Sequence, residues 1–189
     1  EVAASGSNAK GIILATSGLN ASGLLEVTGG GVTVNGAGST AIQSNASGPD
    51  GGTSNSVTIR GGVVSATGNS ARAVLLYSTD GAAQTLTIGT EASVTGDLVA
   101  SGSANFTAEL IFDDTGTGEF SDDIEGFTTI SKVDSGTWTL SGSITGNIRF
   151  ALNNVSTSGI VSNAQLIVQS AFGKRERITT INSFDDASL

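Results

Sequence analysis

Acidic side chains gather in one part of this 189-residue sequence, and they are the residues best suited to chemistry. Eight carboxylates lie between positions 109 and 134, where Lys132 is the only cation. They are Glu109, Asp113, Asp114, Glu119, Asp122, Asp123, Glu125 and Asp134. Paired acids hydrolyse glycosidic bonds, and acids beside an arginine can assist calcium-dependent elimination from acidic sugars. A polysaccharide-active hydrolase or lyase is therefore one hypothesis.

The same segment offers hard oxygen ligands of the kind that Ca²⁺ prefers. Its candidate ligands lie in the stretch DDTGTGEFSDD and are Asp113, Asp114, Asp122 and Asp123. The stretch lacks the regular D-x-D-x-D-G spacing with a glutamate at the twelfth position, and it lacks a GGxGxDxUx nonapeptide. A solvated acidic loop is the simpler interpretation. We expect no cofactor, with Ca²⁺ as the one alternative.

Several classes of function are excluded by residues that the chain lacks or has in small number. Histidine and cysteine are absent, which removes Ser-His-Asp and Cys-His catalysis, histidine or thiolate metal sites, and disulfides. Polysaccharide-cleaving β-helices usually flank their acids with basic side chains, and we expect Arg60 and Arg72 to be solvated charges on outward faces. A net charge of −9, with only 8 Lys and Arg, disfavours nucleic acid and anionic membranes as partners. We therefore expect a protein that is not an enzyme.

The elements that must position these residues repeat along the chain. A first apolar series runs from Ile12 to Ile42, Val74 and Leu98, in steps of 30, 32 and 24. A second series runs through Val27, Val57, Leu86 and Leu110, in steps of 30, 29 and 24. A third series comprises Val32 to Val34, Val63-Val64 and Ala92 to Val94. Independent series that keep nearly the same step indicate a repeat architecture.

Each repeat contains three short apolar segments separated by polar or glycine-containing turns, which is the signal of strands. Three strands in roughly 24–32 residues describe one coil of a right-handed parallel β-helix, a solenoid whose coils stack at about 4.8 Å. An antiparallel sandwich is the competing fold, but it needs tight hairpin turns and gives no regular spacing of three series. The sequence predicts an all-β solenoid.

Two regions follow from a change of composition near residue 105. Residues 1–104 predict β-helix coils built of small residues, with protruding loops. Residues 105–189 hold eight of the nine aromatic residues and predict broader coils with rings in the interior. The longest polar interruption, NASGPDGGTSNS at 45–56, predicts a loop that stands out and makes contacts. Its candidate binding residues are Asn45, Asp50, Thr53 and Asn55.

The only tryptophan lies in DIEGFTTISKVDSGTWTLSG, at 123–142. Phe127, Thr129 and Ser131 alternate with their neighbours, and after a polar turn Trp138 alternates with Leu140, so strands are predicted on both sides of the turn. We expect Trp138 to be a core residue, supported by Phe127, Leu140 and Gly142.

The segment SGTWTLSG, at 135–142, resembles the GTWTLSG-type strand repeat of bacterial autotransporter passenger domains, although DSG precedes its Thr-Trp where that family usually has Gly-Ala-Gly. The resemblance implies a right-handed β-helix exported across the outer membrane through a C-terminal β-barrel that is not in this sequence. It implies a secreted or cell-surface adhesin, aggregation factor or virulence scaffold, with 105–189 as an autochaperone-like region that folds first.

The expected partners are a host-surface protein or glycan, or further copies of the chain, which we expect to be a monomer or weak dimer. A phage tail-spike or fibre segment is a further alternative, and it predicts an obligate trimer.

Overall fold

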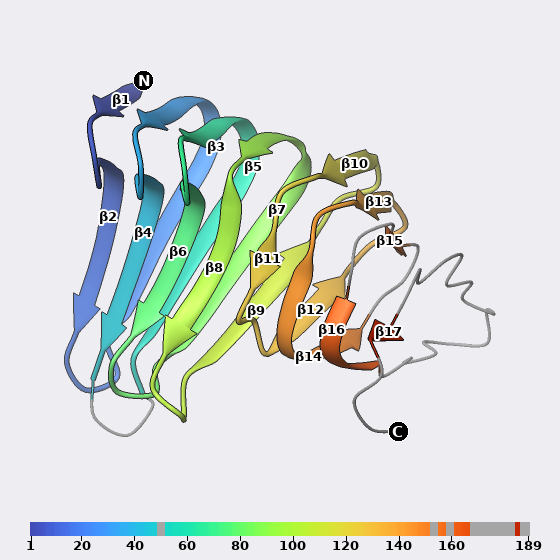
Figure 1. Ribbon diagram of the computed structural model, residues 1–189. Helices are drawn as coiled ribbons and strands as arrows, with labels where there is room; N and C mark the ends of the chain where they lie inside the picture. Colours follow the sequence, from blue (N-terminus) through green and yellow to red (C-terminus); the bar gives the residue numbers. More distant parts are fainter. Residues whose placement is uncertain (49–51, 152–154, 158–160, 167–183, 186–189) are drawn as a thin grey trace.

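The computed structural model describes residues 1–48, 52–151, 155–157, 161–166 and 184–185. Within these ranges the chain forms strands joined by turns and contains no helix. Every strand pair is parallel. In Figure 1 the nearer strands run downward and the farther strands upward while the coils advance from left to right. The protein is therefore a right-handed parallel β-helix, as predicted.

The strands stack into three faces along the solenoid (Figure 1). The front face consists of β2 (Lys10–Ser17), β4 (Thr40–Ser47), β6 (Arg72–Ser78), β8 (Asp97–Gly102), β11 (Ile124–Glu125) and the start of β14 (Ile144–Ala151). The back face consists of the first parts of β3 (Ser22–Asn35), β5 (Ser54–Thr67) and β7 (Ala83–Thr95), then β9 (Thr107–Phe112), β12 (Thr129–Lys132) and the end of β14.

The third face begins with β1 (Val2–Ser5), which pairs with the end of β3. It continues through the second parts of β3, β5 and β7. A separate three-stranded sheet follows, made of β10 (Thr117–Phe120), β13 (Thr137–Leu140) and β15 (Val155–Thr157). Two further strands, β16 (Val161–Leu166) and β17 (Phe184–Asp185), extend the main sheet beyond β14.

Side chains alternate between core and surface because successive residues of a strand point to opposite faces. In β9 the inward side chains of Ala108, Leu110 and Phe112 are fully buried, and Thr107, Glu109 and Ile111 point outward between them. Each inward position lies over the same position of the neighbouring coil. The core is therefore a narrow column that runs along the solenoid axis.

The strand register confirms the first apolar series residue by residue. Ile12 pairs with Ile42, Ile42 with Val74, and Val74 with Leu98, and the same row continues through Ile124 to Ile144. The third series is also confirmed through the pairs Val32–Val64 and Val64–Val94.

The first step of the second series was wrong by two residues. Val57 pairs with Leu25, whereas Val27 pairs with Ile59. The true step is 32 residues rather than 30. Two apolar residues two positions apart both point inward, so the alternation alone does not decide between the two registers.

The coils become shorter toward the C-terminal end, which contradicts the broader coils expected there. Along the row from Ile12 to Val161, successive steps are 30, 32, 24, 26, 20 and 17 residues. The coils shorten because the segment that covers the back and third faces becomes shorter. In the first coils one bent 14-residue strand covers two faces, whereas β12 and β13 have 4 residues each.

Aromatic rings fill the interior of the shorter coils. The side chains of Phe106, Phe112, Phe120, Phe127 and Trp138 are all buried. The change of composition near residue 105 falls in the turn between β8 and β9, which belong to one continuous sheet. The predicted alternation from Phe127 to Lys132 is broken, because Phe127 and Ile130 are both buried. A corner at Gly126 to Thr128 reverses the alternation before β12 begins.

Candidate functional site

The four candidate calcium ligands divide into two pairs at opposite ends of β10. Asp113 and Asp114 precede this strand, and Asp122 and Asp123 follow it. In the described ranges no three acidic side chains are grouped so that they could hold a metal ion. The four residues are close in the sequence, but the fold places them in two separate pairs.

The first pair forms an ionic corner with a basic residue from an earlier coil. Arg60 at the corner of β5 forms an ion pair of 2.8 Å with Asp113, and the Thr90 hydroxyl donates to Asp114 over 3.0 Å. Arg60 is 53% exposed on an outward face, as predicted, but it is also paired with Asp113, which the sequence did not indicate. Although burial raises the pKa of Asp113, contacts from the Asp114 N–H, Asp134 and Arg60 outweigh it and hold that pKa below the usual value.

Lys132 is the feature of this corner that sequence reasoning missed. Its side chain is 2% exposed, and its ammonium donates to the backbone carbonyls of Asp114, Val133 and Asp134. Asp114 and Asp134 have left-handed backbones, with φ of 96° and 62°. The buried charge therefore stabilises two corners that L-residues rarely adopt. Burial lowers the pKa of Lys132, and the carboxylates of Asp134, Asp113 and Asp114 oppose that effect.

This corner contains the basic side chains that a carboxylate enzyme would need, contrary to the expectation from sequence. Lys132 is nevertheless bound to backbone carbonyls, and Arg60 is bound to Asp113. The pKa of Asp114 is also lowered, chiefly by hydrogen bonds from the Thr115 N–H and the Thr90 hydroxyl. Glycoside hydrolysis needs one carboxylic acid with a raised pKa as proton donor, and neither acid of this pair fits that role.

The second pair lies at the corner where β8 and β11 begin. Asp122 accepts from the Gly96 N–H at 2.8 Å, and Asp123 accepts from the Ser143 N–H at 2.9 Å. Asp97 accepts a longer bond of 3.4 Å from the Asp123 N–H. Burial raises the pKa of Asp97, and the neighbouring charges of Asp123 and Asp122 add to this effect. These acids bind backbone N–H groups of neighbouring coils, which is a structural role.

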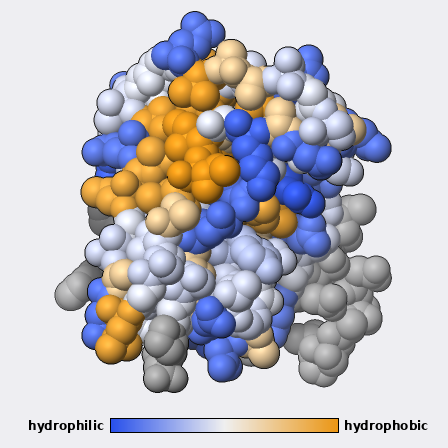
Figure 2. Space-filling model, turned by 90° about the vertical axis from the view of Figure 1, so that its left-hand side faces the viewer, coloured by the Kyte–Doolittle hydropathy of each residue, from blue (hydrophilic) through white to orange (hydrophobic). Residues whose placement is uncertain are grey.

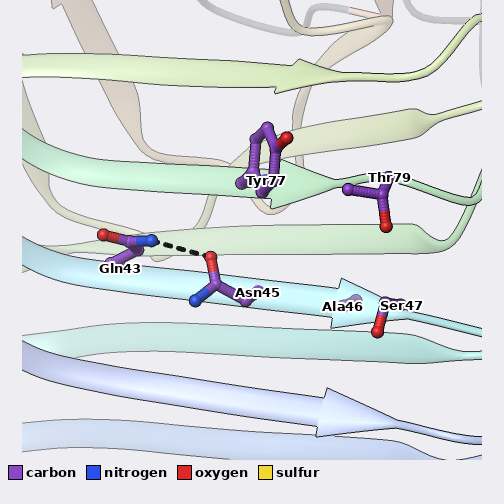
Figure 3. A pocket seen from close by; sticks show the side chains of 6 residues that line it. All are labelled: Gln43, Asn45, Ala46, Ser47, Tyr77 and Thr79. Carbon is purple, nitrogen blue, oxygen red and sulfur yellow. Dashed lines mark hydrogen bonds between the residues drawn. The ribbon is translucent and has the colours of Figure 1, made fainter.

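An open groove lies on the front face, where β4 and β6 run side by side (Figure 3). Its volume is about 300 Å³, and it is lined by Gln43, Asn45, Ala46, Ser47, Tyr77 and Thr79. Tyr77 is 41% exposed, and it pairs with Asn45 in the strand register. Gln43 Nε2 donates to Asn45 Oδ1 over 2.8 Å. The groove is thus a rigid, uncharged polar surface with one aromatic ring.

A buried polar network supports this groove from inside the solenoid. Asn55 Nδ2 donates to the backbone carbonyl of Asn45 and to Ser44 Oγ, both at 3.0 Å. The Ser44 hydroxyl donates to Gln84 Oε1, and Gln84 Nε2 donates to the backbone carbonyl of Tyr77 at 2.7 Å. Both carbonyls on the central rung of the groove are therefore held by amides from the back face.

The candidate binding loop is much shorter than its composition indicated. Asn45 lies within β4 and lines the groove, whereas Asn55 lies within β5. Thr53 and Asn55 are buried, so the prediction that they protrude was wrong. Asp50 lies outside the described residues. The Thr53 hydroxyl donates to the Gly18 carbonyl of the previous coil, and a buried partner of this kind explains why a polar residue is inside.

Tyr77 and Gln43 were not singled out from the sequence, although one signal pointed to Tyr77. It is the only aromatic residue before position 105, and it alternates with Leu76 and Ser78, which are buried. An aromatic residue at an outward position of a strand is the pattern that could have identified the groove.

The predicted structural residues of the tryptophan segment lie where they were expected. Trp138 and Leu140 are buried in β13, and Phe127 is buried at the preceding corner. Gly142 passes so close to the Asp122 carbonyl that a side chain has no room. The one prediction for this segment that was wrong is the alternation between Phe127 and Lys132.

A hydrophobic patch covers the end of the solenoid at its first coil (Figure 2). The core side chains of Ile12 and Leu14, on the edge strand β2, are only partly buried at this end. The exposed large apolar side chains of β2, β3 and the turn between them are Ile13, Leu19 and Leu24, the last of which is 71% exposed. Apolar surfaces of this kind are typical of association sites.

Comparisons with protein-family models, with curated proteins and with solved structures find no match. In the described part of the chain there is no helix with the length and apolar character needed to cross a membrane. The groove and the two acidic corners are therefore the features from which a function can be inferred.

Proposed function

We propose that this chain is a non-catalytic binding segment, secreted or held at a bacterial cell surface, that acts as an adhesin, aggregation factor or virulence scaffold. The observation that carries the proposal is the open, uncharged groove on the regular front face, built from side chains of two adjacent coils. A stacked sheet presents such a surface without rearrangement, so contacts made there cost little ordering.

The resemblance of SGTWTLSG to autotransporter passenger repeats supports the proposed location and the role of the C-terminal coils. Trp138 and the neighbouring buried rings give these coils the largest buried side chains of the described chain. We propose that they form first and then template the coils before them, because each coil of a solenoid gains stability from its neighbour.

The direct test is adhesion. Beads coated with the folded chain should attach to mammalian epithelial cells, or clump with each other, more than beads coated with the urea-denatured chain. Weak single contacts become strong through many copies, so the effect should rise steeply with coating density. Equal attachment of both kinds of bead at every density would refute the proposal.

Self-association has its own support in the hydrophobic patch around Leu24. Light scattering over a range of concentrations should give a monomer or a weak dimer. An obligate trimer that persists on dilution would instead favour a fibre segment of the kind that phage tail spikes use.

Catalysis is tested by incubation with polyuronides and neutral glycans, followed by assays for new reducing ends and unsaturated products. We expect no product, because Asp113 and Asp114 are held ionised and the acids of the second corner bind backbone N–H groups. Product formation that is lost in Asp97→Asn would assign an enzyme to the second corner and refute the non-catalytic proposal.

A further inference from the structure

We infer that the groove between β4 and β6 is a subsite for one or two units of an uncharged sugar chain, with the ring of Tyr77 as its platform. The inference rests on the proposed function, because it names the partner that the front face would bind. The first residue that supports it is Tyr77. Tyr77 is 41% exposed near the end of β6, between the buried side chains of Leu76 and Ser78. An aromatic face with a polar tip suits a ligand that has apolar C–H faces and hydroxyl edges, as a sugar ring does.

The amides beside the ring offer both kinds of hydrogen-bonding atom. Gln43 Nε2 donates to Asn45 Oδ1 along β4, on one side of the groove (Figure 3). In the described structure Gln43 Oε1 has no partner. An amide supplies donors and an acceptor from one planar group, and a sugar hydroxyl needs both. Gln43 Oε1 is buried, so rotation of the amide toward a ligand hydroxyl would satisfy this oxygen and would exchange the bond to Asn45 for bonds to the ligand.

The site is held in place before any ligand arrives. Asn55 and Gln84 bind the backbone carbonyls of Asn45 and Tyr77 from inside the solenoid. Side chains on strands whose backbone is fixed on both sides lose little freedom on binding. Asn55 and Gln84 are therefore positioning residues for the groove, although they are buried and do not reach the ligand.

The charge of the protein selects among sugars. None of the six lining residues is charged, and the whole chain carries a net charge of −9. A uronic or sialic acid would be repelled without a cation in the groove to balance it, whereas a neutral sugar is unaffected. A groove of about 300 Å³ is at the small end of the range for ligand sites, which fits one or two rings. We expect a dissociation constant on the order of 1 mM for a single site, so that adhesion requires many copies.

The experiment measures binding of the full chain, joined into a tetramer, to immobilised glycans. The neutral probes are maltotriose, cellotriose and tri-N-acetylchitotriose, and the charged control is trigalacturonate. At least one neutral probe should bind, and trigalacturonate should not. Tyr77→Ala should reduce binding of that probe at least tenfold, and Tyr77→Phe should retain most of it because the ring remains. The matched control is Ser101→Ala, since Ser101 is exposed and pairs with Tyr77 on the adjacent strand outside the groove.

Circular dichroism of all three variants should match that of the parent chain, because both altered positions are exposed. Binding of a neutral probe that survives Tyr77→Ala would overturn the site. No binding to any neutral probe by a chain that still mediates bead adhesion would overturn the sugar inference and leave the proposed function standing. Failure of adhesion itself would refute the proposed function, and this outcome is distinct from the other two.

Discussion

The substitution Trp138→Ala tests how the C-terminal coils are held together. Trp138 is 2% exposed, and its ring lies 4.6 Å from that of Phe112, centroid to centroid, at an angle of 40°. Its indole N–H donates to the backbone carbonyl of Asp113 over 3.3 Å. Gly118 lies beside it in the strand register, and a Cβ added there would come within 2.7 Å of the indole ring. The ring therefore fills the space between adjacent coils.

The expected loss of stability is dominated by the cavity that the ring leaves. Removal of a buried tryptophan side chain typically costs about 3–5 kcal/mol. The contact with Phe112 accounts for about 1 kcal/mol of that range, and the hydrogen bond to Asp113 for about another 1 kcal/mol. For a chain of this size, 4 kcal/mol corresponds to a fall in melting temperature of roughly 8–16 °C.

Urea denaturation followed by far-ultraviolet circular dichroism measures the whole solenoid. With the tryptophan removed, the fluorescence of Tyr77, the only tyrosine, reports on the early coils alone. Since the early coils depend on the ring-filled coils for their stability, the Tyr77 transition of the variant should lie at no higher urea than its circular dichroism transition. A loss below about 0.5 kcal/mol would show that the ring contributes little to the core and would refute the packing argument.

A double-mutant cycle with Gly118→Ala separates packing from other causes. Alone, Gly118→Ala should destabilise the chain by about 1–3 kcal/mol, because the indole has no room to move away from the methyl group. In the Trp138→Ala background the methyl group enters the cavity, so the same change should be neutral or stabilising. Equal costs in both backgrounds would mean that the two residues do not pack together.

Three further predictions concern polar side chains that have a partner on another part of the coil or on another coil. Lys132→Met should lower the free energy of unfolding by about 2–3 kcal/mol in urea denaturation, because three carbonyls lose a charged donor at two left-handed corners. An unchanged free energy of unfolding would contradict the proposed role of the ammonium. Arg60→Ala should cost about 0.5–1 kcal/mol at pH 7, since the arginine is half exposed. The pKa of Asp113 is lower folded than unfolded, so its stabilisation is present above about pH 4 and is lost as pH falls through the folded value, and the cost of Arg60→Ala should shrink over the same fall in pH. Asn55→Ala should cost about 1–3 kcal/mol by the same assay, because it removes the donor to Ser44 and to the Asn45 carbonyl, and an unchanged midpoint would refute the network.

The fold was predictable because a solenoid repeats its own signal. Ile12, Ile42 and Val74 stand at nearly constant spacing, and the structure stacks them in one row. The register at Leu25 and Val27 was not predictable. Both side chains point inward, so alternation allows Val57 of the next coil to pair with either of them, and the corner at Gly29 to Gly31 does not decide between the two. Periodicity fixes which face a residue occupies, whereas the neighbouring coil fixes its partner.

The candidate site was less predictable because polarity was equated with exposure. Asn55 and Thr53 have the composition of a loop, yet both are buried, Thr53 with a hydrogen-bond partner on the previous coil and Asn55 with a partner on the facing strand of its own coil. Lys132 is buried for the same reason, through carbonyls of a corner that lies 18 residues earlier and of its own turn. The alternation of a strand does not show such partners, because they meet only when a coil closes on itself or stacks on its neighbour.

The two halves of the column are filled by different means, and this difference bears on where a binding surface can lie. Most buried polar side chains, including Ser44, Asn55 and Gln84, belong to the early coils, whereas the buried rings begin at Phe106. A hydrogen bond adds about 1 kcal/mol net, while a buried ring adds several times that, so the early coils should open at lower free energy. Their inner amides nevertheless fix the backbone at the Asn45–Tyr77 rung more specifically than apolar packing would, because a hydrogen bond has a direction. A groove on these coils is thus ordered by the same polar interior that makes them the less stable half, and it depends on the ring-filled coils for its stability.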